Sequence, residues 1–292
     1  MDFQAVNSPY LVPYQGGQTV SDLSTIPPDG QGGKKKNKSV RKDLVSELYE
    51  LQRVLYADDR YSVLLIFQAM DAGGKDSTIR SVLTGVNPAG FQVYSFKVPS
   101  AEELDHDFLW RTSKRLPERG RIGVFNRSYY EEVLVVRVHT GILDGQKLPS
   151  VPDDLTGFWQ ERYNSILDHE EHLAKNGTII LKFWLNVSKQ EQKNRFLSRL
   201  DKPEKHWKFS VGDVKERMYW DSYMHAYQEM INATSRPWAP WYAIPADDKP
   251  YMRKTVAELI VQNLRALDIA YPTVDPEEKA RFDEMRQLLT GE

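Results

Sequence analysis

Short apolar runs that alternate with amphipathic segments constrain the fold of this chain more than any other feature. Three such runs lie at residues 61–67, 122–125 and 178–185, and they lack the polar–apolar alternation of a half-buried strand. Unbroken apolar strands are typical of parallel sheets that are covered on both faces. Between them, segments such as 42–58 place leucines at spacings of three and four, which predicts a helix with one apolar face. The sequence therefore predicts an α/β fold, a mainly parallel sheet flanked by helices.

The rest of the chain fits the same alternation. Two more strands are expected near residues 91–98 and 241–244, and Ser100, with Glu103 three residues later, is placed to begin a helix over 101–114. Further helices are expected near 76–83, from about 130, and over 156–175, 189–200, 214–232 and 251–267. Ligands of such sheets bind beyond the carboxyl ends of the strands, so the loops that follow the five strands are expected to share the functional edge.

Composition sets the broad class of the protein. The 292 residues include no cysteine, which excludes disulfides and a thiol nucleophile, and the net charge of −2 argues against a nucleic-acid partner. Residues 1–40 are rich in Gly, Pro, Ser and Gln and predict a flexible N-terminal arm, followed by a folded domain over 41–270 and a C-terminal helix or tail over 271–292. Neither a secretory signal nor a membrane span is recognisable, so we expect a cytoplasmic protein without a membrane partner.

The segment between residues 69 and 78 has the features of a phosphate-binding loop. The strand at 61–67 leads into Gly73-Gly74-Lys75, and a helix follows. Glycines let backbone N–H groups turn toward an anion, the helix N-terminus adds partial positive charge, and a lysine adds a full charge. The match to the P-loop (Walker A) signature G-x-x-x-x-G-K-[ST] is imperfect, because Ala69 replaces the first glycine and Asp76 replaces the final Ser or Thr.

We expect the phosphates to bind the backbone and side chains of this loop. The residues that form this predicted contact are Ala72, Gly73, Gly74, Lys75, Asp76 and Ser77. Asp71 and Asp76 flank the lysine, and hard carboxylate oxygens suit a Mg²⁺ ion shared with phosphate oxygens. The alternative for Asp76 is a carboxylate that only favours the helix dipole.

Several separated motifs resemble those of the second polyphosphate kinase family, over roughly residues 42–267. They comprise the loop at 67–76, the segments 96–100 and 106–111, the segment 123–131 and the segment 241–249. The family's second motif usually reads Phe-Asp-Arg-Ser, and Asn126 replaces its aspartate here, which resembles the class III branch. The resemblance implies a P-loop kinase fold similar to thymidylate kinase, with a helical lid at about 199–215.

The resemblance also implies the reaction and its participants. The terminal phosphate of inorganic polyphosphate would pass to nucleoside mono- and diphosphates with Mg²⁺, in a homo-oligomer that is a dimer or a tetramer. Asp71, Lys75 and Arg127 would be catalytic, and Asp71, Asn126 and Glu131 would hold the metal. A basic track would bind the phosphate chain; its candidates are Arg80, Lys97 and Arg111, with Lys205 and Lys208 on the lid. For each lid lysine the alternative is an ordinary surface charge.

Other interpretations remain open from the sequence. An ATP-dependent nucleoside monophosphate kinase would have the same fold, and a non-catalytic module could bind phosphate chains or nucleic acid without turnover. The segment 169–172, His-Glu-Glu-His, lacks the i, i+4 histidine spacing of a zinc helix, which favours a solvated helix face.

Overall fold

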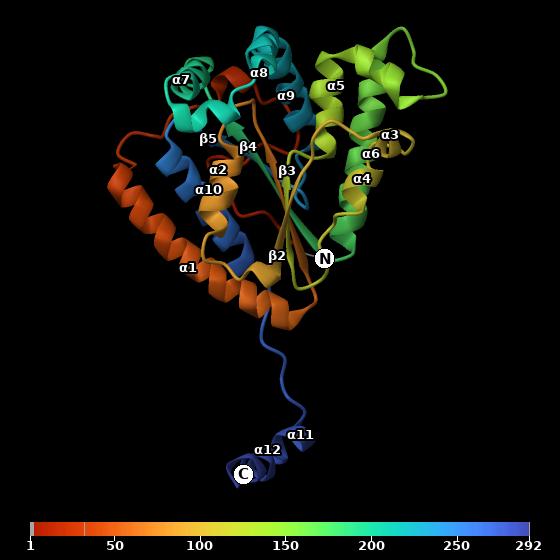
Figure 1. The fold of residues 1–292 in the computed structure, drawn as a ribbon. Helices are drawn as coiled ribbons and strands as arrows, with labels where there is room; N and C mark the ends of the chain where they lie inside the picture. Colours follow the sequence, from red (N-terminus) through yellow and green to blue (C-terminus); the bar gives the residue numbers. More distant parts are fainter. Residues whose placement is uncertain (1–2, 32, 292) are drawn as a thin grey trace.

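The computed structural model describes residues 3–31 and 33–291, and its centre is a five-stranded sheet (Figure 1). The strands follow the order β2-β3-β1-β4-β5, and all four neighbouring pairs are parallel. Their bounds are Ser62–Gln68 (β1), Phe91–Ser95 (β2), Ile122–Asn126 (β3), Thr178–Asn186 (β4) and Trp241–Pro245 (β5). Every residue of β1, β3, β4 and β5 is buried. The predicted α/β class with a parallel sheet is confirmed.

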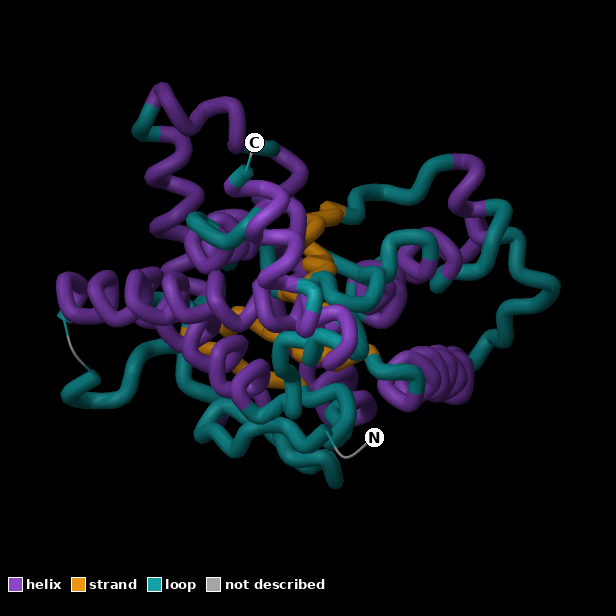
Figure 2. Tube along the Cα trace, turned by 90° about the horizontal axis from the view of Figure 1, so that it is seen from below, coloured by secondary structure: helices purple, strands orange, loops and turns teal. Residues whose placement is uncertain are grey.

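Helices cover both faces of the sheet (Figure 2). On one face α1, α2 and α10 pack together, and on the other α6 and α9 pack against each other next to α5. The helices are Lys34–Asp58 (α1), Lys75–Leu83 (α2), Ala101–Leu104 (α3), Trp110–Ser113 (α4), Val135–Val138 (α5), Leu155–Lys175 (α6), Lys189–Leu200 (α7), Val211–Glu216 (α8), Trp220–Thr234 (α9), Lys249–Arg265 (α10), Pro276–Ala280 (α11) and Phe282–Thr290 (α12).

Three predicted helices are interrupted. The helix expected over 101–114 begins with the predicted capping box at Ser100 but breaks into α3 and α4. The Asp107 carboxylate accepts a hydrogen bond from the Leu109 N–H (2.9 Å), and such local bonds compete with the helical ladder. Likewise a 3₁₀ turn, Arg217–Tyr219, separates α8 from α9, and a 3₁₀ segment, Tyr129–Val133, precedes α5.

The N-terminal segment is more ordered than the sequence predicted. Helix α1 begins at Lys34 rather than near residue 42, and Val12 and Val20 are buried against the domain. The Val12 N–H donates to the Trp241 carbonyl (2.9 Å), and the Ala243 N–H donates to the Tyr10 carbonyl (2.8 Å). This segment thus pairs with the outer edge of β5, whose backbone groups would otherwise lack partners. Between residues 10 and 20, the segment that was expected to be a flexible arm therefore packs on the domain.

The C-terminal helices α11 and α12 stand away from the domain (Figure 1), and all of their residues are exposed. Across residues 3–31 and 33–291 no helix is both long enough and apolar enough to cross a membrane.

A buried polar cluster corrects one sequence interpretation. Glu170 was expected on a solvated face of α6, yet its side chain is fully buried and pairs with Lys182 of β4 (2.6 Å). The carboxylate also accepts hydrogen bonds from the hydroxyls of Tyr129 (2.9 Å) and Tyr130 (2.8 Å). A buried charge needs such partners, and only the packing of α6 on the sheet provides them.

Candidate active site

The loop between β1 and α2 adopts the conformation of a phosphate cradle. Gly74 has a φ of 109°, a value that L side chains rarely adopt. Gly73 is needed for a different reason, because a Cβ there would lie 2.7 Å from the Ala69 Cβ and 2.8 Å from the Met70 carbonyl oxygen. Helix α2 begins at Lys75, so the N–H groups of its first turn face outward without intrahelical acceptors.

Lys75 lies buried at the centre of this cradle. Its Nζ donates to the Ala69 carbonyl oxygen at 2.6 Å. Burial and then the nearby charge of Arg127 lower the pKa of Lys75 to about 8. A bound phosphate oxygen would favour the charged ammonium, so this lysine is poised to bind an anion.

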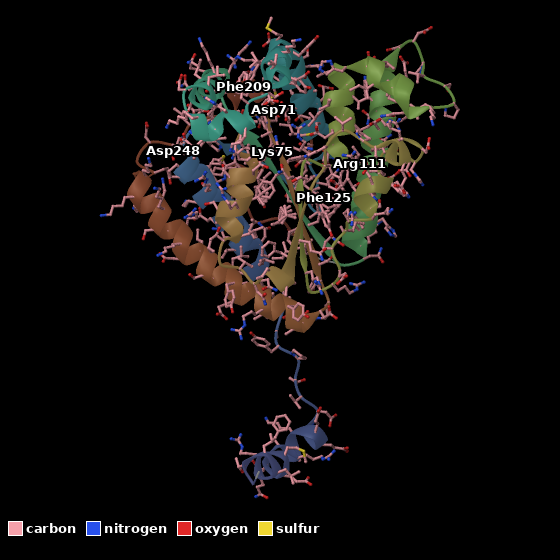
Figure 3. The ribbon with its side chains drawn as sticks, viewed as in Figure 1. Asp71, Lys75, Arg111, Phe125, Phe209 and Asp248 are labelled. Carbon is pink, nitrogen blue, oxygen red and sulfur yellow. The ribbon has the colours of Figure 1, made fainter. Side chains whose placement is uncertain are left out.

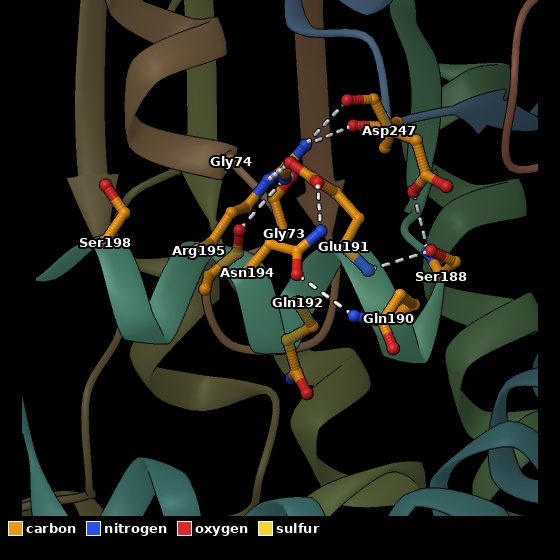
Figure 4. Close-up of polar contacts among 12 residues, drawn as sticks. Gly73, Gly74, Ser188, Gln190, Glu191, Gln192, Asn194, Arg195, Ser198 and Asp247 are labelled. Atoms are coloured by element: carbon orange, nitrogen blue, oxygen red, sulfur yellow. Dashed lines mark hydrogen bonds and ion pairs between the residues drawn. The ribbon is translucent and has the colours of Figure 1, made fainter.

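Helix α7 holds the loop from behind (Figure 4). Gln192 donates to the Asp71 carbonyl (2.9 Å), and Arg195 donates to the carbonyls of Ala72 (3.0 Å) and Gly73 (2.9 Å). Three successive carbonyl oxygens are therefore drawn toward α7. Arg195 also donates to the Ala246 and Asp247 carbonyls in the loop after β5, so a single side chain joins two loops of the site.

Arg127 joins two of the predicted acidic residues. It follows β3 with a φ of 65°, and its guanidinium pairs with Asp71 (2.7 Å) and with Glu131 (2.9 Å). The pKa of Arg127 is raised, first by the charge of Glu131 and also by that of Asp71. The arginine therefore stays charged and is held directly in front of the loop.

Asn126 contacts the other acid of the loop. Its Nδ2 donates to Asp76 Oδ1 at 2.7 Å and to Ser95 Oγ at 3.3 Å. The predicted metal trio is thus divided, since Asp71 and Glu131 share Arg127 whereas Asn126 contacts Asp76. Among the described residues, no three His, Cys, Asp or Glu side chains are grouped to hold a metal by themselves.

The residues present nevertheless fit Mg²⁺. This ion keeps much of its water and is usually bound by one or two carboxylates together with substrate phosphates. Asp71 and Asp76 both line the pocket above the loop, which provides that number of carboxylates next to the phosphate cradle.

The loop opens into a cavity of about 930 Å³ at the carboxyl edge of the sheet. Figure 3 shows Asp71 and Lys75 at this edge, below the segment that carries Phe209. The cavity brings together most of the predicted site: Asp71, Ala72, Gly73, Gly74, Lys75, Asp76, Ser77, Arg80, Lys97, Asn126, Arg127, Lys205 and Lys208. Nine lysine and arginine side chains line it against four carboxylates, so it is strongly positive in a chain of net charge −2.

Two predicted residues do not line this cavity. Glu131 lies behind Arg127. Arg111 packs on the Phe96 ring, with its guanidinium carbon 5.2 Å from the ring centroid, and donates to the Lys97 carbonyl (2.7 Å). Figure 3 places Arg111 on the α4 side, away from Asp71 and Lys75. Its contacts support the segment that carries Lys97.

Other cavity residues were not predicted as site residues. Arg195 and Arg199 on α7, Asp213 on α8 and Lys249 at the start of α10 all line it. Lys249 directly follows the loop after β5. The expectation that ligands bind beyond the carboxyl ends of the strands could therefore have identified it. Arg199 pairs with Asp213 (3.1 Å), which links the end of α7 to the lid segment.

Comparison with known proteins agrees with this site. The sequence profile of the polyphosphate kinase 2 (PPK2) family matches residues 31–272. The chain belongs to the polyphosphate kinase 2 family. Its sequence is 56% identical over 245 residues to an ADP-polyphosphate phosphotransferase of Rhodopseudomonas palustris, covering 84% of this chain and 85% of the relative. It is 45% identical over 255 residues to an AMP/ADP-polyphosphate phosphotransferase of Meiothermus ruber, covering 86% of this chain and 91% of the relative.

A solved polyphosphate kinase 2 structure shares the fold. The crystal structure of polyphosphate kinase 2 from Arthrobacter aurescens superposes with a TM-score of 0.86 at 36% identity, covering 99% of this chain and all of that one. The P-loop kinase fold and the family expected from the motifs are both confirmed.

Proposed function

We propose that this polyphosphate kinase 2 family member transfers the terminal phosphate of inorganic polyphosphate to nucleoside mono- and diphosphates. The observation that carries the proposal is the excess of nine cationic over four anionic side chains around one phosphate loop. A polyanion with a charge on every unit needs such a surface. An ATP-dependent monophosphate kinase would bind a donor with only three phosphates, and its site needs fewer cations.

The chain's own residues perform positioning and charge neutralisation, which dominate phosphoryl transfer. Backbone N–H groups at the start of α2 and the Lys75 ammonium would bind the donor phosphates. Arg127 would stabilise charge on the transferring group, while Asp71 and Glu131 hold its guanidinium in place. The lid residues Lys205 and Lys208 would contact phosphates from above and exclude water, which suppresses hydrolysis.

Mg²⁺ belongs to this proposal as the metal cofactor. Asp71 and Asp76 would hold it, and Asn126 would orient Asp76. When bound, Mg²⁺ neutralises phosphate charge and orients the phosphoryl oxygens. Glu131, which the resemblance implied as a metal ligand, would instead act through Arg127, with which it pairs.

The acceptor range follows the class III branch that Asn126 indicates. The two relatives described above differ in the acceptors that their names carry, ADP for one and AMP or ADP for the other. We include both acceptors in the proposal. It further includes a cytoplasmic homo-oligomer, either a dimer or a tetramer, and a kinase domain that begins no later than Lys34, the first residue of α1, ends near residue 270 and has its lid at about 199–215.

A transfer assay tests the function. The purified protein is incubated with polyphosphate, Mg²⁺ and either AMP, ADP, GMP or GDP, without ATP, and products are separated by chromatography. We expect ADP and ATP from AMP and ADP. No product from any acceptor, although the protein binds polyphosphate, would favour the non-catalytic module. In a parallel reaction ATP replaces polyphosphate as the donor; products that form from AMP only in that reaction would favour the monophosphate kinase.

A further inference from the structure

Three arginines from three different helices gather beside the phosphate cavity. Arg80 of α2 lines the cavity, and Arg41 of α1 donates to the hydroxyl of Ser81, the neighbour of Arg80. Arg253 of α10 lies one helical turn beyond Lys249, which also lines the cavity. These helices pack on one another on the same face of the sheet (Figure 1). The cluster therefore extends the positive lining of the cavity outward.

Apart from the Ser81 hydroxyl, which accepts from Arg41, the cluster is poor in acceptors for its charges. The Nε atoms of Arg41 and Arg253 are buried, and neither has a hydrogen-bond partner among the residues that the structure describes. In the described part of the chain, none of the ion pairs involves Arg41, Arg80 or Arg253. Arg80 is exposed, whereas Arg41 and Arg253 are half-buried, so their charges are partly desolvated without an ion-pair partner among the described residues to offset that cost.

The electrostatic field at the cluster agrees with its geometry. Burial lowers the pKa of Arg253, and the charges of Arg41, Arg80 and Arg195 lower it further. Like charges that repel one another at a rim of the cavity would be stabilised by an anion that contacts several of them.

A positive path continues from this cluster along α1. Lys34, Lys38 and Arg41 follow one another at spacings of four and three, so they share one face of the helix. The first turn of α1 contains three lysines and no acidic residue, although the dipole already makes a helix N-terminus positive. An anion bound along this face would offset both the lysine charges and the positive end of the helix dipole.

We propose that Arg41 and Arg253, together with Arg80, form an outer subsite for the part of the polyphosphate chain that extends beyond the cavity. The inference rests on the proposed function, because it assigns a longer stretch of the same donor. Only a chain that reaches past the cavity can contact this subsite, so the subsite distinguishes long polyphosphate from short.

Two matched double variants test the subsite. Arg41→Gln with Arg253→Gln removes two positive charges from the cluster. The control, Arg53→Gln with Arg265→Gln, removes the same charge from the same two helices, at positions already paired with Glu50 and Glu47. For each protein, KM is measured with long-chain polyphosphate and with tripolyphosphate, at constant ADP and at several salt concentrations.

We expect the cluster variant to raise the KM for long-chain polyphosphate about tenfold and to weaken its salt dependence, because fewer phosphate charges are neutralised. Its KM for tripolyphosphate should change less than about twofold, and the control should match wild type with both donors. Equal changes with both donors, or an equal change in the control, would overturn the subsite.

Binding calorimetry separates this inference from the proposed function. If wild type binds polyphosphate without transferring phosphate, the proposed function is wrong. The ratio of long-chain polyphosphate affinity to tripolyphosphate affinity in the two variants then still tests whether the subsite exists. The cluster variant should also keep or raise the thermal stability of the free protein, since it removes repulsion between like charges. A loss of folding in this variant would contradict the electrostatic argument.

Discussion

Arg195 provides a sharp test of how the phosphate loop is held. Its guanidinium has five N–H groups, and each has an acceptor: Glu191, the two carbonyls at residues 72 and 73, and the two at 246 and 247. Arg195→Lys keeps the charge but offers only three N–H donors. At least two of the five acceptors must therefore lose their partner.

The size of the effect follows from this count. A hydrogen bond to a charged group contributes about 1.5 kcal/mol at the lower end of the usual range, so two lost bonds amount to about 3 kcal/mol. Arg195 does not itself contact the reacting atoms in this arrangement; it is a positioning residue for the loop. If the loop must keep its shape in the transition state, a loss of this size lowers kcat/KM about 100-fold.

The assay measures kcat and KM separately with polyphosphate and ADP, together with amide hydrogen exchange across residues 72–77. We expect kcat to fall more than KM rises, and exchange of these amides to accelerate. Arg265→Lys serves as the control, because this exposed arginine on α10 pairs with Glu47, away from the phosphate loop. Denaturant unfolding verifies that each variant is folded under the assay conditions.

A result of the opposite kind would refute this reasoning. If Arg195→Lys keeps kcat/KM within a factor of about three of wild type and the loop amides exchange at the wild-type rate, the contacts from α7 do not set the loop geometry. A fall in unfolding free energy without any change in kcat would assign Arg195 a role in stability alone.

Three further predictions concern the loop lysine, its acidic neighbour and the buried core pair. Lys75→Ala and, separately, Asp71→Asn should lower kcat/KM by about 100-fold or more while unfolding curves stay near wild type; near-normal turnover in either would remove its assigned role. Polyphosphate binding should take up protons between about pH 8 and 10 and weaken as the pH rises, because burial lowers the pKa of Lys75 and of Lys249 to about 8 and phosphate binding favours their charged forms. Calorimetry in buffers of different ionisation enthalpy measures this uptake, and its absence would contradict the prediction. Glu170→Gln should reduce the free energy of unfolding by about 3–5 kcal/mol, since it leaves the buried Lys182 ammonium unpaired. Adding Lys182→Met should restore part of this loss in denaturant titrations, and no recovery would argue against the ion pair as the cause.

The sequence by itself determined the features that depend on neighbouring residues. The sheet class follows from unbroken apolar runs, and the cradle follows from a strand, two glycines, Lys75 and a helix within about fifteen residues of chain. The capping box at Ser100 is equally local and was found in full. Each of these depends on interactions that the chain makes within one or two turns, so the pattern alone reveals them.

Only the tertiary structure decided which distant side chains complete the site. Arg195 contacts carbonyls more than 120 residues earlier in the chain, and the charge of Arg41 acts on Arg253 only because α1 and α10 pack together. The same is true of Glu170, whose burial depends on the packing of α6 against the sheet. A charged residue in a helix has the same local pattern whether it faces water, a buried partner or a ligand. Its environment is fixed by the neighbouring elements, and helical periodicity does not contain that information.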